Sequence, residues 1–234
     1  MKISLSSINQ FKKEGFLIAP KLIKKKNCSL LIKKLKSFKN YKEPLKNKDL
    51  VFEKNKIKYF KNINFYINEF NTLLNNSILE TSSKLINDKS YFLNIGLHNK
   101  IPGKTATPPH QDNFYWCRKP NNALTAYVAL NRQTKKTGVI GYLPKSHVGK
   151  LYPHKKSRIK AFSSYIESLE GAKKNFVFPN LNPGDVVFHH CNTVHASSKN
   201  KSKKYERKSI AITIYGENTK LDTKMKKKYL RNIK

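Results

Sequence analysis

The chain has 234 residues, 38% of them hydrophobic and including 13 phenylalanines and 12 tyrosines, which predicts a folded globule with a sizeable core and excludes a disordered chain. Its formal net charge of +34 favours anionic partners. Only five of the 48 basic residues are arginine, and 25 residues are asparagine. This pattern indicates a coding bias that explains much of the lysine content. We therefore expect an anionic small substrate rather than nucleic acid. Three distant cysteines, Cys28, Cys117 and Cys191, exclude a disulfide framework and a Cys-x-x-Cys zinc site.

The first part of the chain, residues 1–90, has helical patterning. Apolar residues recur at helical spacing over 28–38 and 64–87, with lysines and other polar side chains between them. A short apolar run, Phe16-Leu17-Ile18, lies between Gly15 and Pro20 and predicts a strand. We therefore expect a short first helix capped by Ser7 and ended by Gly15, two further helical segments, one short strand, and a polar connection over 40–64 that forms a loop and short strands.

From residue 91 onward, short β-type runs alternate with turn residues. Eight runs are present, at 91–97, 107–116, 124–131, 138–143, 175–178, 185–189, 194–197 and 208–215. Together with the helical first part, they predict a mainly β fold with flanking helices, whose core is a double-stranded β-helix (a cupin-like jelly roll). The segment 145–174, with a predicted helix over 157–169, interrupts the strands and is long enough to be a lid.

These features predict a single domain over residues 1–234. It would consist of a helical part (1–90), a jelly-roll core (91–216) with the insertion 145–174, and a basic tail (217–234). The N-terminus lacks the apolar stretch of a signal peptide and no run reaches about 18 apolar residues, so we expect a cytoplasmic protein with no membrane partner. The sequence leaves the oligomeric state open.

The run Pro109-His110-Gln111-Asp112 contains a candidate metal-binding pair. On a strand, residues two apart point to the same side, so His110 and Asp112 would present an imidazole and a carboxylate together. With a distant histidine they would form the 2-His-1-carboxylate set that is typical of non-haem Fe(II) oxygenases. The alternative is a hydrogen-bonded pair on the strand surface.

Further along, Asn182-Pro183-Gly184-Asp185 has the form of a turn that leads into a strand, and three histidines follow it. The chain here resembles the phytanoyl-CoA dioxygenase family of Fe(II)/2-oxoglutarate-dependent oxygenases. The resemblance begins at FKKEGFLIAPKLIKK, continues through HQDNFYW, ALTAYVALN, GVIGYLPKSHVGK and LNPGDVVFHH, and ends at HASSKNKSKKYERKSIAITIY. These fragments follow the family's order and span most of the chain.

The resemblance implies that His110, Asp112 and His195 bind Fe(II). It favours His195 over His189 and His190 because the fragment that follows, with its serine and arginine, is in register with His195. The other histidines are expected to be structural or, for His98 and His154, to face the solvent.

The resemblance also implies that Arg207 pairs with the far carboxylate of 2-oxoglutarate. A planar guanidinium binds a carboxylate through two parallel hydrogen bonds, which lysine cannot reproduce. Ser197, two residues after the third histidine, matches a hydroxyl that helps to hold the same carboxylate. Asn94 and Tyr127 lie on predicted strands and are expected to line the co-substrate pocket.

The implied reaction consumes O2 and 2-oxoglutarate, releases succinate and CO2, and hydroxylates an unactivated C–H bond of a small metabolite. Asp112 favours hydroxylation because related halogenases lack this carboxylate. Basic residues in the insertion, such as Lys150 and Arg158, favour an anionic substrate. Two alternatives remain: a cupin-like metal protein or isomerase, in which Arg207 has no co-substrate, and a polyanion-binding module with salt-dependent binding.

Overall fold

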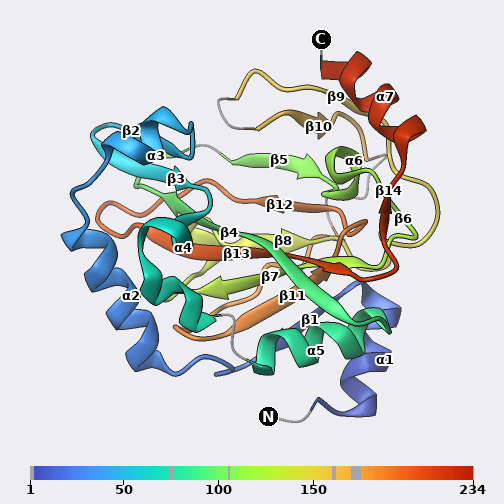
Figure 1. Ribbon diagram of the computed structural model, residues 1–234, viewed down its shortest axis with the longest axis horizontal. Helices are drawn as coiled ribbons and strands as arrows, with labels where there is room; N and C mark the ends of the chain where they lie inside the picture. The colour runs from blue at the N-terminus through green and yellow to red at the C-terminus, as the bar shows by residue number, and fades with distance from the viewer. Residues whose placement is uncertain (1–2, 74–75, 105, 160–161, 170–174, 234) are drawn as a thin grey trace.

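The computed structural model of the chain describes residues 3–73, 76–104, 106–159, 162–169 and 175–233. Figure 1 shows a large sheet and a small sheet that face each other, with the N-terminal helices packed along the large sheet. Two facing antiparallel sheets form a jelly roll. The predicted fold class is therefore confirmed.

The large sheet contains seven antiparallel strands. Their order is β1-β11-β7-β13-β4-β3-β2. Their bounds are β1 Phe16–Ala19, β2 Leu50–Glu53, β3 Lys56–Phe60, β4 Ser90–Lys100, β7 Ala123–Ala129, β11 Val186–His190 and β13 Arg207–Gly216. The runs predicted at 91–97, 124–131, 185–189 and 208–215 correspond to β4, β7, β11 and β13, with ends shifted by a few residues.

One face of the large sheet is apolar. Successive side chains of a strand point to opposite faces, and apolar residues occupy every second position of the central strands. On β13, Ile210, Ile212 and Ile214 share this face and are fully buried. They pack with Leu124 and Val128 of β7 in the main hydrophobic core. Burying a side chain of this size stabilises the fold by about 1.5–3 kcal/mol. The apolar face therefore packs into the core, and the site can form only on the opposite face of the sheet.

The helices of the first part of the chain cover this apolar face. Their bounds are α1 Leu5–Glu14, α2 Lys25–Ser37, α3 Lys42–Lys46, α4 Ile63–Tyr66, the 3-10 helix η1 Asn68–Leu73 and α5 Asn76–Ile86. The single helix predicted over 64–87 is wrong, because Ile67 has an extended backbone and separates α4 from η1. The break allows Ile67, Phe70 and Leu73 all to be buried. Of the helices that the structure describes, none could span a membrane.

The opposite face of the large sheet carries polar side chains. Arg207, Ser209 and Thr213 alternate with the isoleucines of β13, and Thr125 and Tyr127 alternate with the apolar residues of β7. All five are buried. Buried polar groups require hydrogen-bond partners, so this inner face is where a polar site is expected.

The small sheet lies over the inner face. It contains β5 (Thr107–His110), β12 (His195–Ser197) and β8 (Ile140–Tyr142), in that order. The runs predicted at 107–116, 138–143 and 194–197 correspond to these strands, although β5 is much shorter than its run. The strand predicted over 175–178 is wrong: Val177 makes only an isolated bridge to Tyr142.

The insertion 145–174 forms a strand pair beside the small sheet. The helix predicted over 157–169 is wrong, because the described part of this segment contains β9 (His154–Lys156) and β10 (Ser164–Ile166), which pair with each other. His154 is buried rather than solvent-facing, whereas His98 is exposed as predicted. The remaining elements are the 3-10 helix η2 (Lys135–Thr137), the paired strands β6 (Arg118–Lys119) and β14 (Lys220–Leu221), α6 (Asn113–Trp116) and α7 (Thr223–Ile233).

Candidate active site

Three side chains converge between the two sheets, from His110, Asp112 and His195. One potential ligand atom from each lies within 4.8 Å of the others. Asp112 Oδ1 is 3.9 Å from His110 Nε2 and 3.6 Å from His195 Nε2. All three residues are buried. Two imidazoles and one carboxylate are a donor set for a first-row divalent metal such as Fe(II), with coordination positions left open.

The two histidines are placed by strand pairing, but Asp112 is not. His110 and His195 are register partners on β5 and β12. Strand β5 ends at His110, and Asp112 has helical backbone angles (φ −60°, ψ −39°) directly before α6. The predicted placement of His110 and Asp112 on one strand face is therefore wrong. The chain turns at Gln111, whose N–H donates to His154 Nε2 instead of to the β5 ladder.

Backbone carbonyls orient both imidazoles. His110 Nδ1 lies 3.0 Å from the Pro108 carbonyl oxygen, and His195 Nδ1 lies 2.9 Å from that of Thr193. A carbonyl only accepts, so each Nδ1 carries the proton and each Nε2 has a free lone pair toward Asp112. Hydrogen bonds of this kind fix the tautomer of metal-binding histidines.

The Asp112 carboxylate is contacted by side chains from three elements, β7, β11 and α6. Thr125 Oγ1 on β7 donates to Oδ2 at 2.9 Å, and His189 Nε2 on β11 lies 3.4 Å from the same oxygen. The Tyr115 hydroxyl, on α6, donates to Oδ1. These contacts fix the plane of the carboxylate before any metal binds.

The protonation states suit metal binding. Burial lowers the pKa of the His110 and His195 imidazoles, so both are neutral at neutral pH. Burial alone would raise the pKa of the Asp112 carboxyl, but the surrounding imidazoles in their protonated form, His195 first among them, and the hydrogen bond from His189 lower it below its ordinary value. An ionised carboxylate beside two neutral imidazoles is the state that a metal requires.

Arg207 lies on the same inner face, at the start of β13. It is 4% exposed, and its Nη1 donates to Tyr127 Oη at 3.1 Å and to Ser209 Oγ at 2.7 Å. The Tyr127 hydroxyl in turn donates to Gln133 Oε1 at 2.7 Å. The guanidinium is therefore held in one orientation.

The Nε of Arg207 is buried and has no hydrogen-bond partner among the described residues. An unsatisfied donor on a buried cation is costly unless a ligand accepts from it. A carboxylate is the group that pairs best with a guanidinium edge. The residues present therefore fit both Fe(II) and a co-substrate with a carboxylate at its far end.

The structure brings two of the other three predicted co-substrate residues to the arginine end of the face. Tyr127 contacts Arg207 directly, and Ser197 lies on β12 and accepts a hydrogen bond from the Lys100 ammonium. Asn94 lies elsewhere, in the row of the sheet with Thr213, whose hydroxyl donates to Asn94 Oδ1 at 3.4 Å. Thr213 is in turn paired with Thr125, which contacts Asp112, so Asn94 lies toward the metal-site carboxylate rather than toward Arg207.

The insertion and the C-terminal helix cover the site from outside. The Phe162 ring packs edge-on against His110, with 4.7 Å between ring centroids. The buried Gln111 side chain accepts from the Tyr152 N–H and donates to the Asn192 carbonyl, which ties the insertion to the metal-site turn. In α7, Asn232 donates to the His154 carbonyl. These contacts exclude water from one side of the three ligands.

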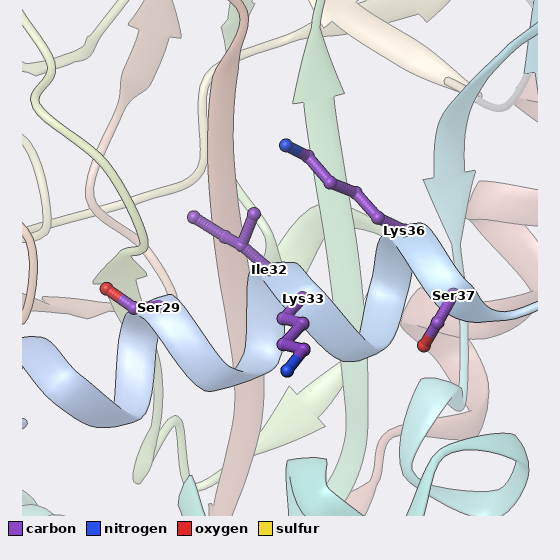
Figure 2. A pocket seen from close by; sticks show the side chains of 5 residues that line it. All are labelled: Ser29, Ile32, Lys33, Lys36 and Ser37. Atoms are coloured by element: carbon purple, nitrogen blue, oxygen red, sulfur yellow. The ribbon is translucent and has the colours of Figure 1, made fainter.

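A shallow basic hollow on helix α2 lies outside this site. Figure 2 shows its five lining residues on one helix, with Lys33 and Lys36 extending in different directions. The two ammonium groups do not converge on a common point. The lysines of α2 thus form a solvated helix face, as the helical pattern predicts.

Sequence reasoning missed several residues that surround the candidate ligands, namely Thr125, Ser209, His189, Tyr115 and Gln133. For the first two a signal was present, because polar residues at every second position of an otherwise apolar strand mark a polar inner face. The sequence presents His189 only as a rival of His195 for the metal. Tyr115 and Gln133 lie in a short helix and a loop, whose side-chain directions follow no simple period.

Comparison with known proteins is consistent with this site. The family model for phytanoyl-CoA dioxygenase (PhyH) matches residues 11–209. A probable alpha-ketoglutarate-dependent hypophosphite dioxygenase from Stutzerimonas stutzeri is 30% identical over 137 residues, which are 53% of this chain and 47% of that protein. The peroxisomal phytanoyl-CoA dioxygenase of Bos taurus is 32% identical over 123 residues, 49% of this chain and 36% of that protein. The chain thus spans half or less of these curated relatives.

Solved structures share the fold over nearly the whole chain. EctD from S. alaskensis, with bound Fe, has a TM-score of 0.77 at 18% identity and covers 94% of this chain and 79% of its own. The epimerase SnoN, in complex with Fe3+ and alpha ketoglutarate, has a TM-score of 0.72 at 17% identity and covers 92% of this chain and 84% of its own. The family match, which covers most of the chain, identifies this protein as a member of the phytanoyl-CoA dioxygenase family.

Proposed function

We propose that this protein is an Fe(II)- and 2-oxoglutarate-dependent oxygenase. One observation carries the proposal: a buried His-Asp-His cluster and a buried arginine whose Nε has no partner among the described residues lie between the two sheets of a jelly roll. A cupin-like metal protein without a co-substrate has no need for the arginine. The relatives and neighbours named above support the same class.

Each residue has a role that its contacts support. His110, Asp112 and His195 would hold Fe(II) through Nε2, a carboxylate oxygen and Nε2, leaving three positions open. Iron bound there would supply the activation of O2 that is coupled to the oxidative decarboxylation of 2-oxoglutarate to succinate and CO2. Arg207 would bind the far carboxylate of 2-oxoglutarate and thereby orient its keto-acid end toward the metal.

The remaining assignments concern the co-substrate pocket. Tyr127 would hold the Arg207 guanidinium by accepting from it, and Ser197 would offer its hydroxyl to the same carboxylate. Asn94 would line the pocket on the metal side, because it shares a sheet row with Thr213 and Thr125. Phe162 would exclude water above His110.

For the reaction, we propose hydroxylation of an unactivated C–H bond in a small anionic metabolite. The presence of Asp112 supports hydroxylation, because the metal then has no vacant carboxylate position for a halide. The net charge of +34 and the hypophosphite dioxygenase among the relatives support an anionic substrate. An epimerase and a carbocyclase occur among the structural neighbours, so the assay must identify the product as well as the turnover.

The test is Fe(II)-dependent formation of succinate from 2-oxoglutarate in air, with a panel of small phosphonates, hypophosphite, amino acids and acyl-CoA esters. Substrate-stimulated succinate formation and incorporation of one atom of 18O from O2 into the product are expected. Asp112→Ala should abolish both, whereas Glu217→Ala, an exposed carboxylate remote from the cluster, should not. Equal succinate formation by wild type and Asp112→Ala would contradict the proposal.

A further inference from the structure

A second buried cation lies beside Arg207. Lys100 is the last residue of β4 and the register partner of Arg207, so the two side chains leave the sheet on the same face. Lys100 is only 7% exposed. Its ammonium donates to Ser197 Oγ at 2.5 Å and to the Ser198 carbonyl at 3.0 Å. The ammonium is thus held against the hydroxyl that we assign to the co-substrate.

The backbone at Gly138 packs closely against the Lys100 side chain. Gly138 has a φ of +86°, and a Cβ there would lie 2.6 Å from Lys100 Cδ. Ser197 Oγ is also fixed from the other side, because it accepts from the Thr107 N–H at 3.3 Å. The lysine stem and its hydroxyl partner are therefore positioned by three separate segments.

Lys100 is buried next to a second cation, which disfavours its charged form. Burial, then the Arg207 guanidinium and then Lys58, lower the pKa of Lys100 to about 6. His98, two residues earlier on the same strand, is another titratable group on which the charges of Arg207 and Lys100 act. Two cations in one row of a buried face repel each other, and a carboxylate between them would stabilise both.

We propose that Lys100 is a second cationic ligand of the far carboxylate of 2-oxoglutarate, acting beside Arg207 and through the hydroxyl of Ser197. The site would therefore select 2-oxo acids that carry a second carboxylate. This inference rests on the proposed function and deepens it. It assigns to a lysine of β4 a role that the sequence patterns did not suggest.

The test compares Lys100→Met with Lys104→Met, which loses the same charge but removes an ammonium that pairs with Glu53 on the surface. Binding of 2-oxoglutarate to the Fe(II) protein is titrated calorimetrically without O2. Lys100→Met is expected to bind 2-oxoglutarate roughly tenfold to a hundredfold more weakly, since a hydrogen bond to a charged group is lost. Lys104→Met should bind like wild type.

Two further arms keep the result interpretable. The monocarboxylate 2-oxopentanoate, which lacks the far carboxylate, should bind Lys100→Met and wild type equally. Retained Co(II) binding shows that a variant is folded, and Lys100→Gln, which keeps a donor toward Ser197, replaces Lys100→Met if the latter does not fold. Wild-type affinity for 2-oxoglutarate in the folded lysine variant would overturn the role of Lys100 alone. Failure of the wild type itself to bind 2-oxoglutarate would overturn the proposed function as well.

Discussion

Thr125 Oγ1 donates a hydrogen bond of 2.9 Å to Oδ2 of Asp112. The donor lies in the middle of the large sheet, and the acceptor lies in the turn after β5 of the small sheet. This contact joins the two sheets at the candidate metal site. Oδ1, which lies 3.9 Å from His110 Nε2 and 3.6 Å from His195 Nε2 and also accepts from the Tyr115 hydroxyl, is then the natural ligand atom.

Thr125→Val should weaken metal binding without removing a ligand. The substitution keeps the shape of the side chain but removes the donor that orients Asp112, a change that typically costs about 10–100-fold in metal affinity. Thr213→Val is the matched control, because the Thr213 hydroxyl contacts Asn94 and lies one strand further from the carboxylate. Metal affinities measured by competition with a chelating dye would check this, and equal affinities for the two variants would argue against an orienting role.

Arg207→Lys should weaken 2-oxoglutarate binding and leave Fe(II) binding unchanged. Lysine keeps the charge but lacks the planar fork that pairs with a carboxylate. It also cannot retain the hydrogen bonds to both Tyr127 and Ser209 in the same geometry. We expect the dissociation constant of 2-oxoglutarate to rise by at least about tenfold, as for a lost charge-assisted hydrogen bond. Arg118→Lys, whose guanidinium stacks on Tyr215, serves as control.

The stability of the metal-free protein should fall as the pH decreases from about 6.5 to about 4. Burial lowers the pKa of His154 to about 4, while an unfolded histidine titrates near 6.5. Between these values the unfolded chain binds a proton that the folded chain does not, so acid favours unfolding. In urea unfolding across this pH range, the free energy of unfolding of His154→Gln should depend less steeply on pH than that of the wild type. The difference in slope should correspond to about one proton. An unchanged slope would show that His154 titrates normally.

Two glycines with positive φ should respond differently to alanine. A Cβ on Gly184 (φ +92°) would lie 1.9 Å from the Ile23 carbonyl oxygen, whereas a Cβ on Gly103 (φ +79°) would meet nothing within 4 Å. Both substitutions cost about 1–2 kcal/mol of left-handed backbone strain, and Gly184→Ala adds a backbone clash. The free energy of unfolding should therefore fall clearly further for Gly184→Ala. Equal losses would mean that the turn before β11 can shift to accept the extra atom.

The sequence predicted the jelly roll and the residues that converge, because both depend on regular patterns. Period-two runs identified most strands, and the spacing of His195 and Arg207 matched the family. The placement of Asp112 was wrong because a turn, which has no period, replaces the expected strand after His110. The helix predicted over 157–169 failed for a related reason: strands β9 and β10 are short and lie at the edge of the fold, so few apolar residues mark them.

The contacts that orient the ligands were harder to predict than the ligands. Lys100 is one of 43 lysines (48 basic residues less five arginines), and nothing in its local sequence distinguishes it from the solvated ones. Its burial becomes evident only when β4 pairs with β13 and places it opposite Arg207. The pairing of distant strands, rather than the local sequence pattern, determines which of many similar side chains lies in the site.

The central claim is that His110, Asp112 and His195 together hold one Fe(II) to which 2-oxoglutarate then binds. The most direct measurement is an anaerobic titration of the metal-free protein with Fe(II) and then 2-oxoglutarate, followed by visible absorption. One Fe(II) per chain and a charge-transfer band that requires both additions are predicted for the wild type, with the band absent from His195→Ala. A band of full intensity in His195→Ala, or no band in the wild type, would contradict the account.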